Sequence, residues 1–224
     1  MICILQARIN SKRLPKKVMR KIFNRSILER VIKRIKKSKE VKKIIVATSN
    51  SIQDDLIAKF CKKKKISFYR SNLNNVYLRY YKLINAEKID NFIRVTADSP
   101  LIDPKIIDKY IKIFKKNKVD IVTNTLKRSY PKGQSVEVIN SKIILRSLKA
   151  VSNNKNDQEH ITSYFYRNKD RFKIKNISLK KNLSHLNFSI DTPKDYDFIK
   201  KIIKQSKDRF IGLSSILKIA KKIK

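Results

Sequence analysis

Five cationic side chains lie within ten residues near the start of the chain. They follow directly on a short apolar run, residues 2–7, and are Arg8, Lys12, Arg13, Lys16 and Lys17. Guanidinium and ammonium groups bind phosphate oxygens, so this set could surround a triphosphate and neutralise its charge. The apolar run is typical of a buried strand, and ligands bind at the carboxyl ends of such strands in open α/β sheets. Composition alone leaves open the alternative of a surface loop in a protein that is basic throughout.

Two aspartates occupy matching positions later in the chain. Asp98 follows an expected strand at 91–96, and Asp191 follows one at 186–190. If both strands point the same way, both carboxylates reach the sheet edge that carries the basic loop. Mg²⁺ beside a triphosphate needs such oxygen ligands, usually one or two carboxylates completed by phosphate and water. The alternative, that each aspartate caps the next helix, is weaker because Asp103 and Thr192 fill those capping positions.

Several short motifs together carry a resemblance to a known family. The first is Q-A-R-x-x-S-x-R-L-P-x-K at 6–17, and the last is S-I-D-T-P at 189–193. Between them, in order, are the segments 46–49, 69–71, 75–80, 94–104, 123–125, 130–133, 136–138 and 159–162. Across about residues 2–205 the pattern resembles the sugar cytidylyltransferases, which include synthetases of CMP-linked sialic-type and 3-deoxy-octulosonic acids. It is most similar to the branch named for spore-coat polysaccharide biosynthesis.

The resemblance implies nucleotidyl transfer, in which a sugar hydroxyl attacks the α-phosphorus of CTP and pyrophosphate leaves. It implies catalytic roles for Arg8, Lys17 and Asp98, and a Mg²⁺ ion on Asp98 and Asp191. The nucleotide-binding residues would be Gln6, Ala7, Arg8, Ser11, Arg13, Lys17, Arg70, Ser71 and Asp98. The acidic sugar would contact Asn124, Gly133, Gln134, Glu137, Glu159 and His160. An ordinary strand end is the alternative for Arg70 and Ser71, and a hydrogen-bonded structural histidine is the alternative for His160.

The chain departs from the family pattern at three positions. Lys16 and Asn10 stand where the family loop usually has glycines, and Asn can adopt a left-handed conformation at modest cost. After Gly133 the family usually has Leu-Asp-Val-Glu, whereas residues 134–137 read Q-S-V-E and lack the aspartate. We expect these departures to bear on sugar binding more than on nucleotide chemistry.

Hydrophobic periodicity predicts the elements that position these residues. Strands are expected at 2–7, 43–48, 66–69, 91–96 and 119–123, alternating with helices at 26–37, 52–63, 74–86 and 104–116. This alternation predicts an α/β fold, with a mostly parallel, Rossmann-like sheet and helices on both faces. The resemblance refines this to the nucleotide-diphospho-sugar transferase type. Later elements are expected as strands at 136–139, 172–179 and 186–190 and helices at 141–151, 158–166, 193–205 and 214–224.

We expect one domain over residues 1–224. It would comprise a nucleotide-binding half at 1–124, a small insertion for sugar binding and dimerisation at 125–190, and C-terminal helices at 191–224. Cys3 and Cys61 give no disulfide or metal spacing, which suits a reducing cytoplasm. We expect no signal peptide and no membrane association, because the apolar stretches are short. The resemblance suggests a homodimer.

The net charge of +38 raises the question of a nucleic-acid partner. Only 14 of the 56 basic residues are Arg, and the lysines are spread along nearly every expected helix, a mixture typical of an AT-rich genome. We therefore expect non-specific attraction to polyanions and no specific nucleic-acid partner. The alternatives left open are a nucleotidyltransferase of other nucleotide or acceptor specificity, a sugar transferase of the same fold, and a nucleic-acid-binding protein on a degenerate scaffold.

Overall fold

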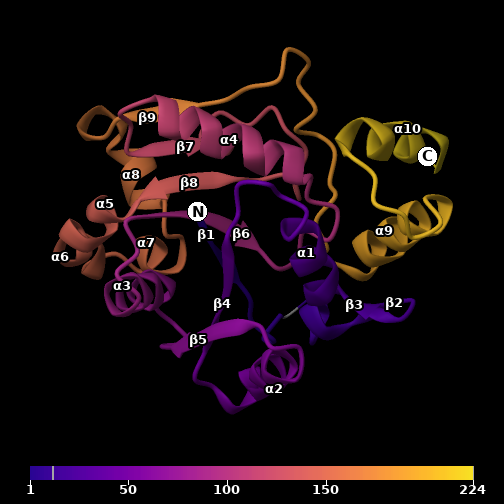
Figure 1. The fold of residues 1–224 in the computed structure, drawn as a ribbon, viewed down its shortest axis with the longest axis horizontal. Helices are drawn as coiled ribbons and strands as arrows, with labels where there is room; N and C mark the ends of the chain where they lie inside the picture. The colour runs from indigo at the N-terminus through magenta and orange to yellow at the C-terminus, as the bar shows by residue number, and fades with distance from the viewer. Residues whose placement is uncertain (12, 224) are drawn as a thin grey trace.

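A central sheet of seven strands organises the protein, as the computed structural model of residues 1–11 and 13–223 shows (Figure 1). The strand order is β5-β4-β1-β6-β8-β7-β9, and a separate hairpin pairs β2 with β3. The strands are β1 (Ile2–Gln6), β2 (Lys21–Ile22), β3 (Arg25–Ser26), β4 (Lys43–Ser49), β5 (Ser67–Ser71), β6 (Asn91–Thr96), β7 (Ile121–Thr123), β8 (Glu137–Asn140) and β9 (Ile174–Asn176).

The sheet is mostly parallel, as the sequence predicted. β1 pairs in parallel with β4 on one side and β6 on the other, and β4 pairs in parallel with β5. Only β8 runs against its neighbours β6 and β7. The carboxyl ends of β5, β4, β1 and β6 therefore meet at one edge of the sheet. The basic loop leaves this edge from the end of β1.

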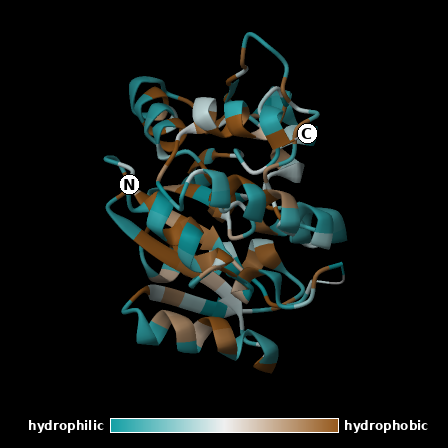
Figure 2. Cartoon of the chain, turned by 90° about the vertical axis from the view of Figure 1, so that its right-hand side faces the viewer, coloured by the Kyte–Doolittle hydropathy of each residue, from teal (hydrophilic) through white to brown (hydrophobic). Residues whose placement is uncertain are grey.

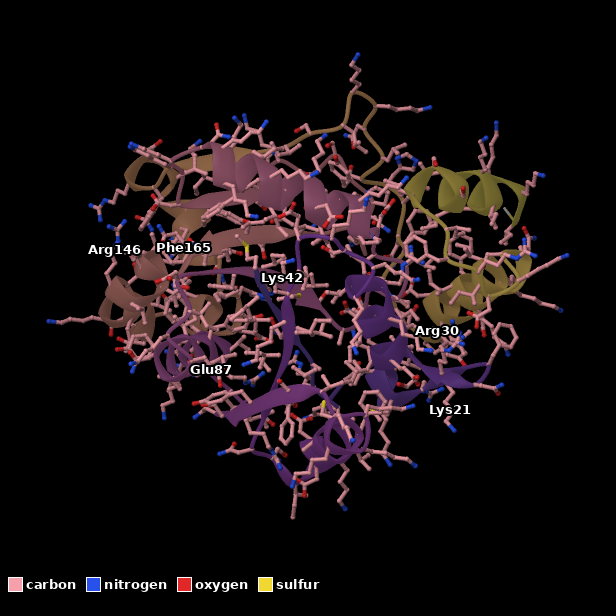
Figure 3. The ribbon with its side chains drawn as sticks, viewed as in Figure 1. Lys21, Arg30, Lys42, Glu87, Arg146 and Phe165 are labelled. Atoms are coloured by element: carbon pink, nitrogen blue, oxygen red, sulfur yellow. The ribbon has the colours of Figure 1, made fainter. Side chains whose placement is uncertain are left out.

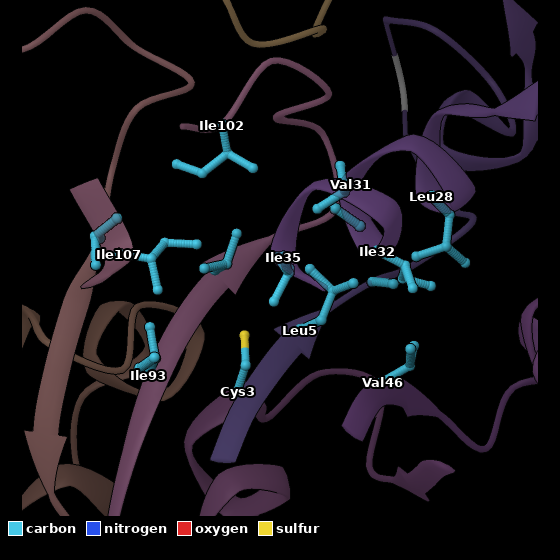
Figure 4. Close-up of a cluster of buried hydrophobic side chains, with 14 of the residues drawn as sticks. Cys3, Leu5, Leu28, Val31, Ile32, Ile35, Val46, Ile93, Ile102 and Ile107 are labelled. Carbon is cyan, nitrogen blue, oxygen red and sulfur yellow. The ribbon is translucent and has the colours of Figure 1, made fainter. Parts of the chain in front are cut away.

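Helices cover both faces of the sheet. Successive apolar side chains of β1 point to opposite faces, so each face needs a cover. Cys3 and Leu5 pack against α1, α2 and α4, and Figure 4 shows much of this cluster. Ile4 points to the other face, toward α3 and the helices α5–α8. The helices are α1 (Ile27–Ile35), α2 (Asp55–Lys63), α3 (Val76–Ala86), α4 (Pro104–Lys116), α5 (Ser141–Arg146), α6 (Leu148–Ser152), α7 (Lys155–Glu159), α8 (Ser163–Arg167), α9 (Pro193–Gln205) and α10 (Leu213–Ile223), with short 3-10 turns η1 (Lys17–Met19), η2 (Ile52–Asp54) and η3 (Lys169–Arg171).

The two C-terminal helices form a third apolar cluster at the side of the sheet. α9 and α10, yellow in Figure 1, stand beside α1 and the β2–β3 hairpin. Their buried side chains, Ile199 and Ile216 among them, pack against Leu14, Phe188 and Ile190. Figure 2 shows the overall result, with hydrophobic strands inside and hydrophilic stretches along the outer helices. No described helix has both the length and the apolar composition needed to cross a membrane.

Several expected elements differ in the structure. The expected helix at 141–151 is divided between α5 and α6, and the one at 158–166 is broken after α7 because His160 is extended. The expected strand at 186–190 is no regular strand. Its Phe188 N donates to Lys132 O (2.9 Å), whereas its Ile190 N donates to Asp98 O (2.9 Å). Since the segment divides its hydrogen bonds between two partners, no ladder with a single strand can form.

Candidate active site

The ammonium of Lys17 lies between the two aspartates singled out in the sequence. Its Nζ is 3.1 Å from Asp98 Oδ2 and 2.7 Å from Asp191 Oδ1. The Lys17 side chain is 12% exposed, whereas those of Asp98 and Asp191 are 25% and 34% exposed. Thr96 Oγ1 also donates to Asp98 (2.7 Å). The structure thus brings together three residues that are far apart in the sequence, at the carboxyl end of β6.

Neither aspartate caps the helix that follows it. Asp103 Oδ1 accepts from Lys105 N (2.9 Å) and caps α4, and Thr192 caps α9 in a capping box with Asp195. Each of these helices begins with a proline, as expected for a first-turn position. Asp98 and Asp191 are therefore left to face the basic loop.

The charges of this cluster shift the pKa values of its members. Burial lowers the pKa of Lys17, but the neighbouring charges and hydrogen bonds of Asp98 and Asp191 outweigh it and leave the pKa raised. Burial raises the pKa of Asp191, but the hydrogen bond and charge of Lys17 outweigh this, with smaller help from Arg13, and leave it lowered. Arg13 lies 3.6 Å from the same carboxylate. Both shifts favour the charged forms of Lys17 and Asp191 at neutral pH.

A buried carboxylate anchors the start of the basic loop. Asp54, 1% exposed, accepts hydrogen bonds from Ile9 N (2.7 Å) and Ser49 N (3.0 Å). Sequence reasoning missed this residue, because an Asp-Asp pair at the first turn of an expected helix is an ordinary helix start. At the other end of the loop Lys16 has φ 55° and ψ 26°, a left-handed conformation at the position where the family usually has glycine. Lys12, the remaining cation of the predicted set, lies outside the described residues.

The loop borders a cavity of about 440 Å³ at this edge of the sheet. Its lining includes six residues predicted to bind nucleotide, metal or sugar, namely Arg8, Ser11, Arg13, Lys17, Glu159 and Asp191. Asn10, Leu73 and Asn74 complete it. A second cavity of about 400 Å³ shares Arg8 and Glu159 with it and adds Lys155 and Gln158. The guanidinium of Arg8 is 3.3 Å from Glu159, and both side chains are about half exposed. The two cavities therefore form one groove across the site.

Arg70 and Ser71, the expected nucleotide contacts, line neither cavity. The guanidinium of Arg70 donates to Ser49 O (2.8 Å) and pairs with Asp55 (2.7 Å), and Ser71 is buried. It is the next residues, Leu73 and Asn74, that line both cavities.

One buried guanidinium holds that segment in place. Arg79, 1% exposed, donates to Asn72 O (2.8 Å) and Leu73 O (3.2 Å). No local pattern marked Leu73 or Asn74, because their placement depends on this bond from the following helix.

Gln6 and Ala7 lie at the end of β1 and belong to the support of the site. Gln6 Oε1 accepts from the guanidinium of Arg94 (3.1 Å), and Ala7 N donates to Ala47 O (3.1 Å). Ala7 is 2% exposed. Both residues fix the point from which Arg8 leaves the sheet.

Three of the expected sugar contacts are interior residues, which corrects the prediction for them. Asn124 and Gln134 are both 0% exposed. The amide of Asn124 joins Gln134 O (2.8 Å) and Val136 N (3.0 Å), and that of Gln134 joins Asp103 N (2.9 Å) and Leu101 O (2.7 Å). Glu137, 3% exposed, accepts from Arg94 and from Thr125, Thr162 and Tyr166. As these side chains lie, none can touch a sugar.

The other expected sugar contacts lie in different settings. Gly133 has φ 83°, and a Cβ there would stand 2.4 Å from Phe188 C, so its role is a close backbone crossing. Glu159 lines both cavities. His160 is exposed beside it and lines neither of them.

The donor set fits Mg²⁺ only in company with phosphate. Among residues 1–11 and 13–223 no three His, Cys, Asp or Glu side chains gather as a metal site. Two carboxylates around one ammonium do occur, and Mg²⁺ commonly uses one or two carboxylates while substrate phosphates and water complete its shell. Asp98 and Asp191 are thus able to hold the ion together with a nucleotide.

Comparison with known proteins identifies the family. The sequence model of the cytidylyltransferase family matches residues 2–223. The chain is 27% identical to the spore coat polysaccharide biosynthesis protein SpsF of Bacillus subtilis over 92% of this chain and 87% of that protein. It is 30% identical to a 3-deoxy-manno-octulosonate cytidylyltransferase of Rickettsia bellii, over 55% of this chain and 51% of that protein.

A solved structure shows the same architecture over nearly the whole chain. It is a cytidylyltransferase from Leptospira borgpetersenii, with a TM-score of 0.93 and 28% sequence identity, covering 99% of this chain and 94% of that one. The family match and the fold agree. The chain belongs to the cytidylyltransferase family and is a nucleotidyltransferase.

Proposed function

We propose that this protein transfers CMP from CTP to an acidic keto sugar of the sialic-acid or 3-deoxy-octulosonic type, for a surface polysaccharide or glycan. The observation that carries the proposal is Lys17 held between Asp98 and Asp191 at a cavity whose wall also presents Arg8 and Arg13. Such a site offers cations for phosphate oxygens and carboxylates for a divalent ion in the same place. A homodimeric state and a cytoplasmic location remain part of the proposal.

The groove accounts for the charge changes of nucleotidyl transfer. Arg8, Arg13 and Lys17 would bind the β- and γ-phosphates and stabilise the pyrophosphate as its bond to the α-phosphorus breaks. Ser11 and the loop amides would fix the orientation of the triphosphate. Mg²⁺, when bound by Asp98 and Asp191, would neutralise charge on the phosphate oxygens.

The acceptor side of the groove is built by α7 and the loop after β5. Glu159, Gln158 and Lys155 line the second cavity together with Arg8. Arg8 and Lys155 offer cations for the sugar carboxylate, and Glu159 and Gln158 offer acceptors for hydroxyl groups. His160, at the end of α7, stays a predicted contact. The relatives support the sugar class, since one is named for 3-deoxy-manno-octulosonate and another for polysaccharide biosynthesis.

Pyrophosphate release tests the proposal. The protein would be incubated with Mg²⁺, one ribonucleoside triphosphate and a panel of sugars: sialic-type acids, 3-deoxy-octulosonic acids, and neutral hexoses as controls. We expect release only with CTP and an acidic keto sugar, with the CMP-sugar recovered by mass spectrometry. Turnover with another triphosphate or a neutral sugar, and none with any acid, would contradict the proposed specificity.

A further inference from the structure

A second concentration of positive charge lies outside the active-site groove, between α1 and the turn that joins α9 to α10. A cavity of about 180 Å³ there is lined by six cationic side chains and one carboxylate, Asp208. The cations are Arg25, Arg30, Lys33, Arg34, Lys37 and Arg209. None of them lines the active-site cavities. Figure 3 labels Arg30 where α1 and α9 meet.

Two buried guanidinium groups form the floor of this cavity. Arg30 is 7% exposed and donates to Asp208 and to Ile22 O, while its Nε has no partner among the described residues. Arg34 is 8% exposed and donates to the carbonyls of Ile102 and Ile211, both at 2.6 Å. Burial lowers the pKa of Arg34 to about 10, against a smaller opposing effect of Asp103. Asp208 is the only carboxylate among the described lining residues, and it pairs with both Arg25 and Arg30. Buried cations that outnumber their carboxylates are costly unless a further anion joins them.

Three of the other cations are exposed on the rim, whereas the fourth, Arg25, pairs with Asp208 (2.5 Å). Lys33, Lys37 and Arg209 form no ion pair within the part of the chain that the structure describes. The ring of Phe210 lies 4.5 Å from the guanidinium of Arg34 and closes one side. Lysines elsewhere are spread over outer helix faces, whereas these side chains converge on a recess, where the positive potential is focused.

We propose that this cavity is a second anion site, which binds a small phosphate-bearing anion such as orthophosphate or pyrophosphate. Guanidinium forks and ammonium groups are the donors that phosphate oxygens prefer. The cavity is smaller than the roughly 300 Å³ at which pockets for larger organic ligands begin, which favours a small anion. The site stands independently of the proposed reaction.

The site also touches the segment that carries a catalytic residue. Pro100 and Leu101 line the cavity, and they belong to the turn that begins at Asp98. That turn is tight, since Ile102 N donates to Ser99 O (3.1 Å) and Gln134 Nε2 donates to Leu101 O (2.7 Å). An anion in this cavity would therefore bind directly behind the loop that presents Asp98 to Lys17.

Methyl NMR on isoleucine-labelled protein would detect this binding directly. Ile203 lines the cavity, and Ile9 lies at the basic loop and reports separately on the active site. Inorganic phosphate and pyrophosphate would be titrated in parallel, at about 150 mM NaCl to suppress generic attraction. We expect a saturable shift of the Ile203 methyl group with at least one of them, and the tighter of the two identifies the anion size that fits.

A matched pair of variants separates the cavity from the overall charge. The rim variant is Lys33→Gln, Lys37→Gln, Arg209→Gln, and the control is Lys59→Gln, Lys62→Gln, Lys63→Gln, three exposed lysines of α2. We expect the rim variant to bind about tenfold more weakly, as the loss of three partly exposed charge contacts implies, and the control to bind like the wild type. Circular dichroism, and an Ile9 methyl signal in the ligand-free variants that matches the ligand-free wild type, would verify folding. Equal weakening in both variants, or no saturable Ile203 shift in the wild type, would overturn the proposal.

Discussion

Lys17, Asp98 and Asp191 are tied by short contacts in the free protein, with Nζ–O distances of 3.1 and 2.7 Å. Three charges held this closely mark the place where a triphosphate and its metal would bind in exchange for the internal ion pairs. Other residues of the basic loop are less constrained, since the Arg8 and Arg13 side chains are 47% and 67% exposed. We therefore expect the two aspartates to position the metal and the more exposed arginines to adapt to the phosphates.

Replacing Asp98 by Asn tests this division. We expect turnover to fall by at least about 100-fold, because the amide keeps the shape but removes the charge that binds the metal. The thermal unfolding midpoint should change little, since Lys17 keeps its contact with Asp191 and the amide oxygen can still accept from Thr96. Asp197→Asn, an exposed position on α9, is the control and should retain full turnover. Near-wild-type turnover by the Asp98 variant would sink the assignment of this residue.

The buried carboxylate of Glu137 stabilises the folded state through its ion pair with Arg94. Burial raises the pKa of Glu137, but Arg94 and the hydrogen bonds of Tyr166 and Thr162 outweigh burial and leave the pKa lowered. The unfolded-state pKa is about 4.3, so the stabilisation is complete above that pH and is lost as pH falls through the folded-state value.

We therefore expect Glu137→Gln to cost about 3–5 kcal/mol of unfolding free energy at neutral pH, because it leaves the buried Arg94 unpaired. The gap between wild type and variant should narrow as pH falls below about 4.3, because the Glu137 carboxylate of the unfolded wild type then takes up a proton. Urea unfolding at a series of pH values measures both. A gap of constant size down to pH 3 would show that the charge of Glu137 is not what stabilises the fold.

At the scale of elements, each segment at the groove is anchored from beneath by a buried charged group. Asp54 holds the loop after β1 through Ile9 N, and Arg79 holds the loop after β5 through Asn72 O and Leu73 O. The 3-10 turn η2, which carries Asp54, and the helix α3, which carries Arg79, thus support the site. Side chains of η2 and α3 fix the loops after β1 and β5.

The sequence predicted the elements whose signal is local and missed those that depend on distant partners. Strands β1, β4 and β6 and the caps Asp103 and Thr192 follow from periodicity and capping chemistry, and the structure has them where expected. The burial of Gln134 could not be foreseen, because its partners are the backbone of Leu101 and Asp103.

The close backbone crossing at Gly133 can be tested by substitution, and the only other glycine of the chain, Gly212, serves as a control. In an alanine variant the Cβ at position 133 would stand 2.4 Å from Phe188 C and 2.6 Å from Ser189 N, at φ 83°. We expect Gly133→Ala to lower the unfolding free energy by on the order of 3 kcal/mol, through overpacking and left-handed strain. Turnover should fall too, since the displaced segment leads to Asp191.

Gly212→Ala is the matched control. Its new Cβ would meet only the Asp103 carboxylate, at 3.0 Å, and its φ is not in the left-handed region. We expect a loss of no more than about 1 kcal/mol. Calorimetry or urea unfolding of both variants gives the comparison, and equal losses would refute the role assigned to the crossing at Phe188.

The whole molecule carries 56 basic and 18 acidic residues. Most of this charge lies on side chains that fringe the surface (Figure 3), so the folded state repels itself at low ionic strength. Raising NaCl from about 10 to 150 mM shortens the screening length from about 30 to 8 Å. We expect the thermal midpoint to rise over this range, and KCl to act equally. A midpoint that falls, or that differs between the two salts, would mean that self-repulsion does not limit stability.

The central claim is that the basic loop and the two aspartates form a site for CTP and a divalent metal. The most direct measurement is thermal unfolding with each of the four ribonucleoside triphosphates, with and without Mg²⁺, at salt high enough to suppress generic attraction. A ligand that binds only the folded state stabilises it by about 2.7 kcal/mol at 100 times its Kd. The account predicts a midpoint increase that is selective for CTP, requires Mg²⁺ and loses its Mg²⁺ dependence in Asp98→Asn. Equal shifts with all four triphosphates, or no shift with CTP, would contradict it.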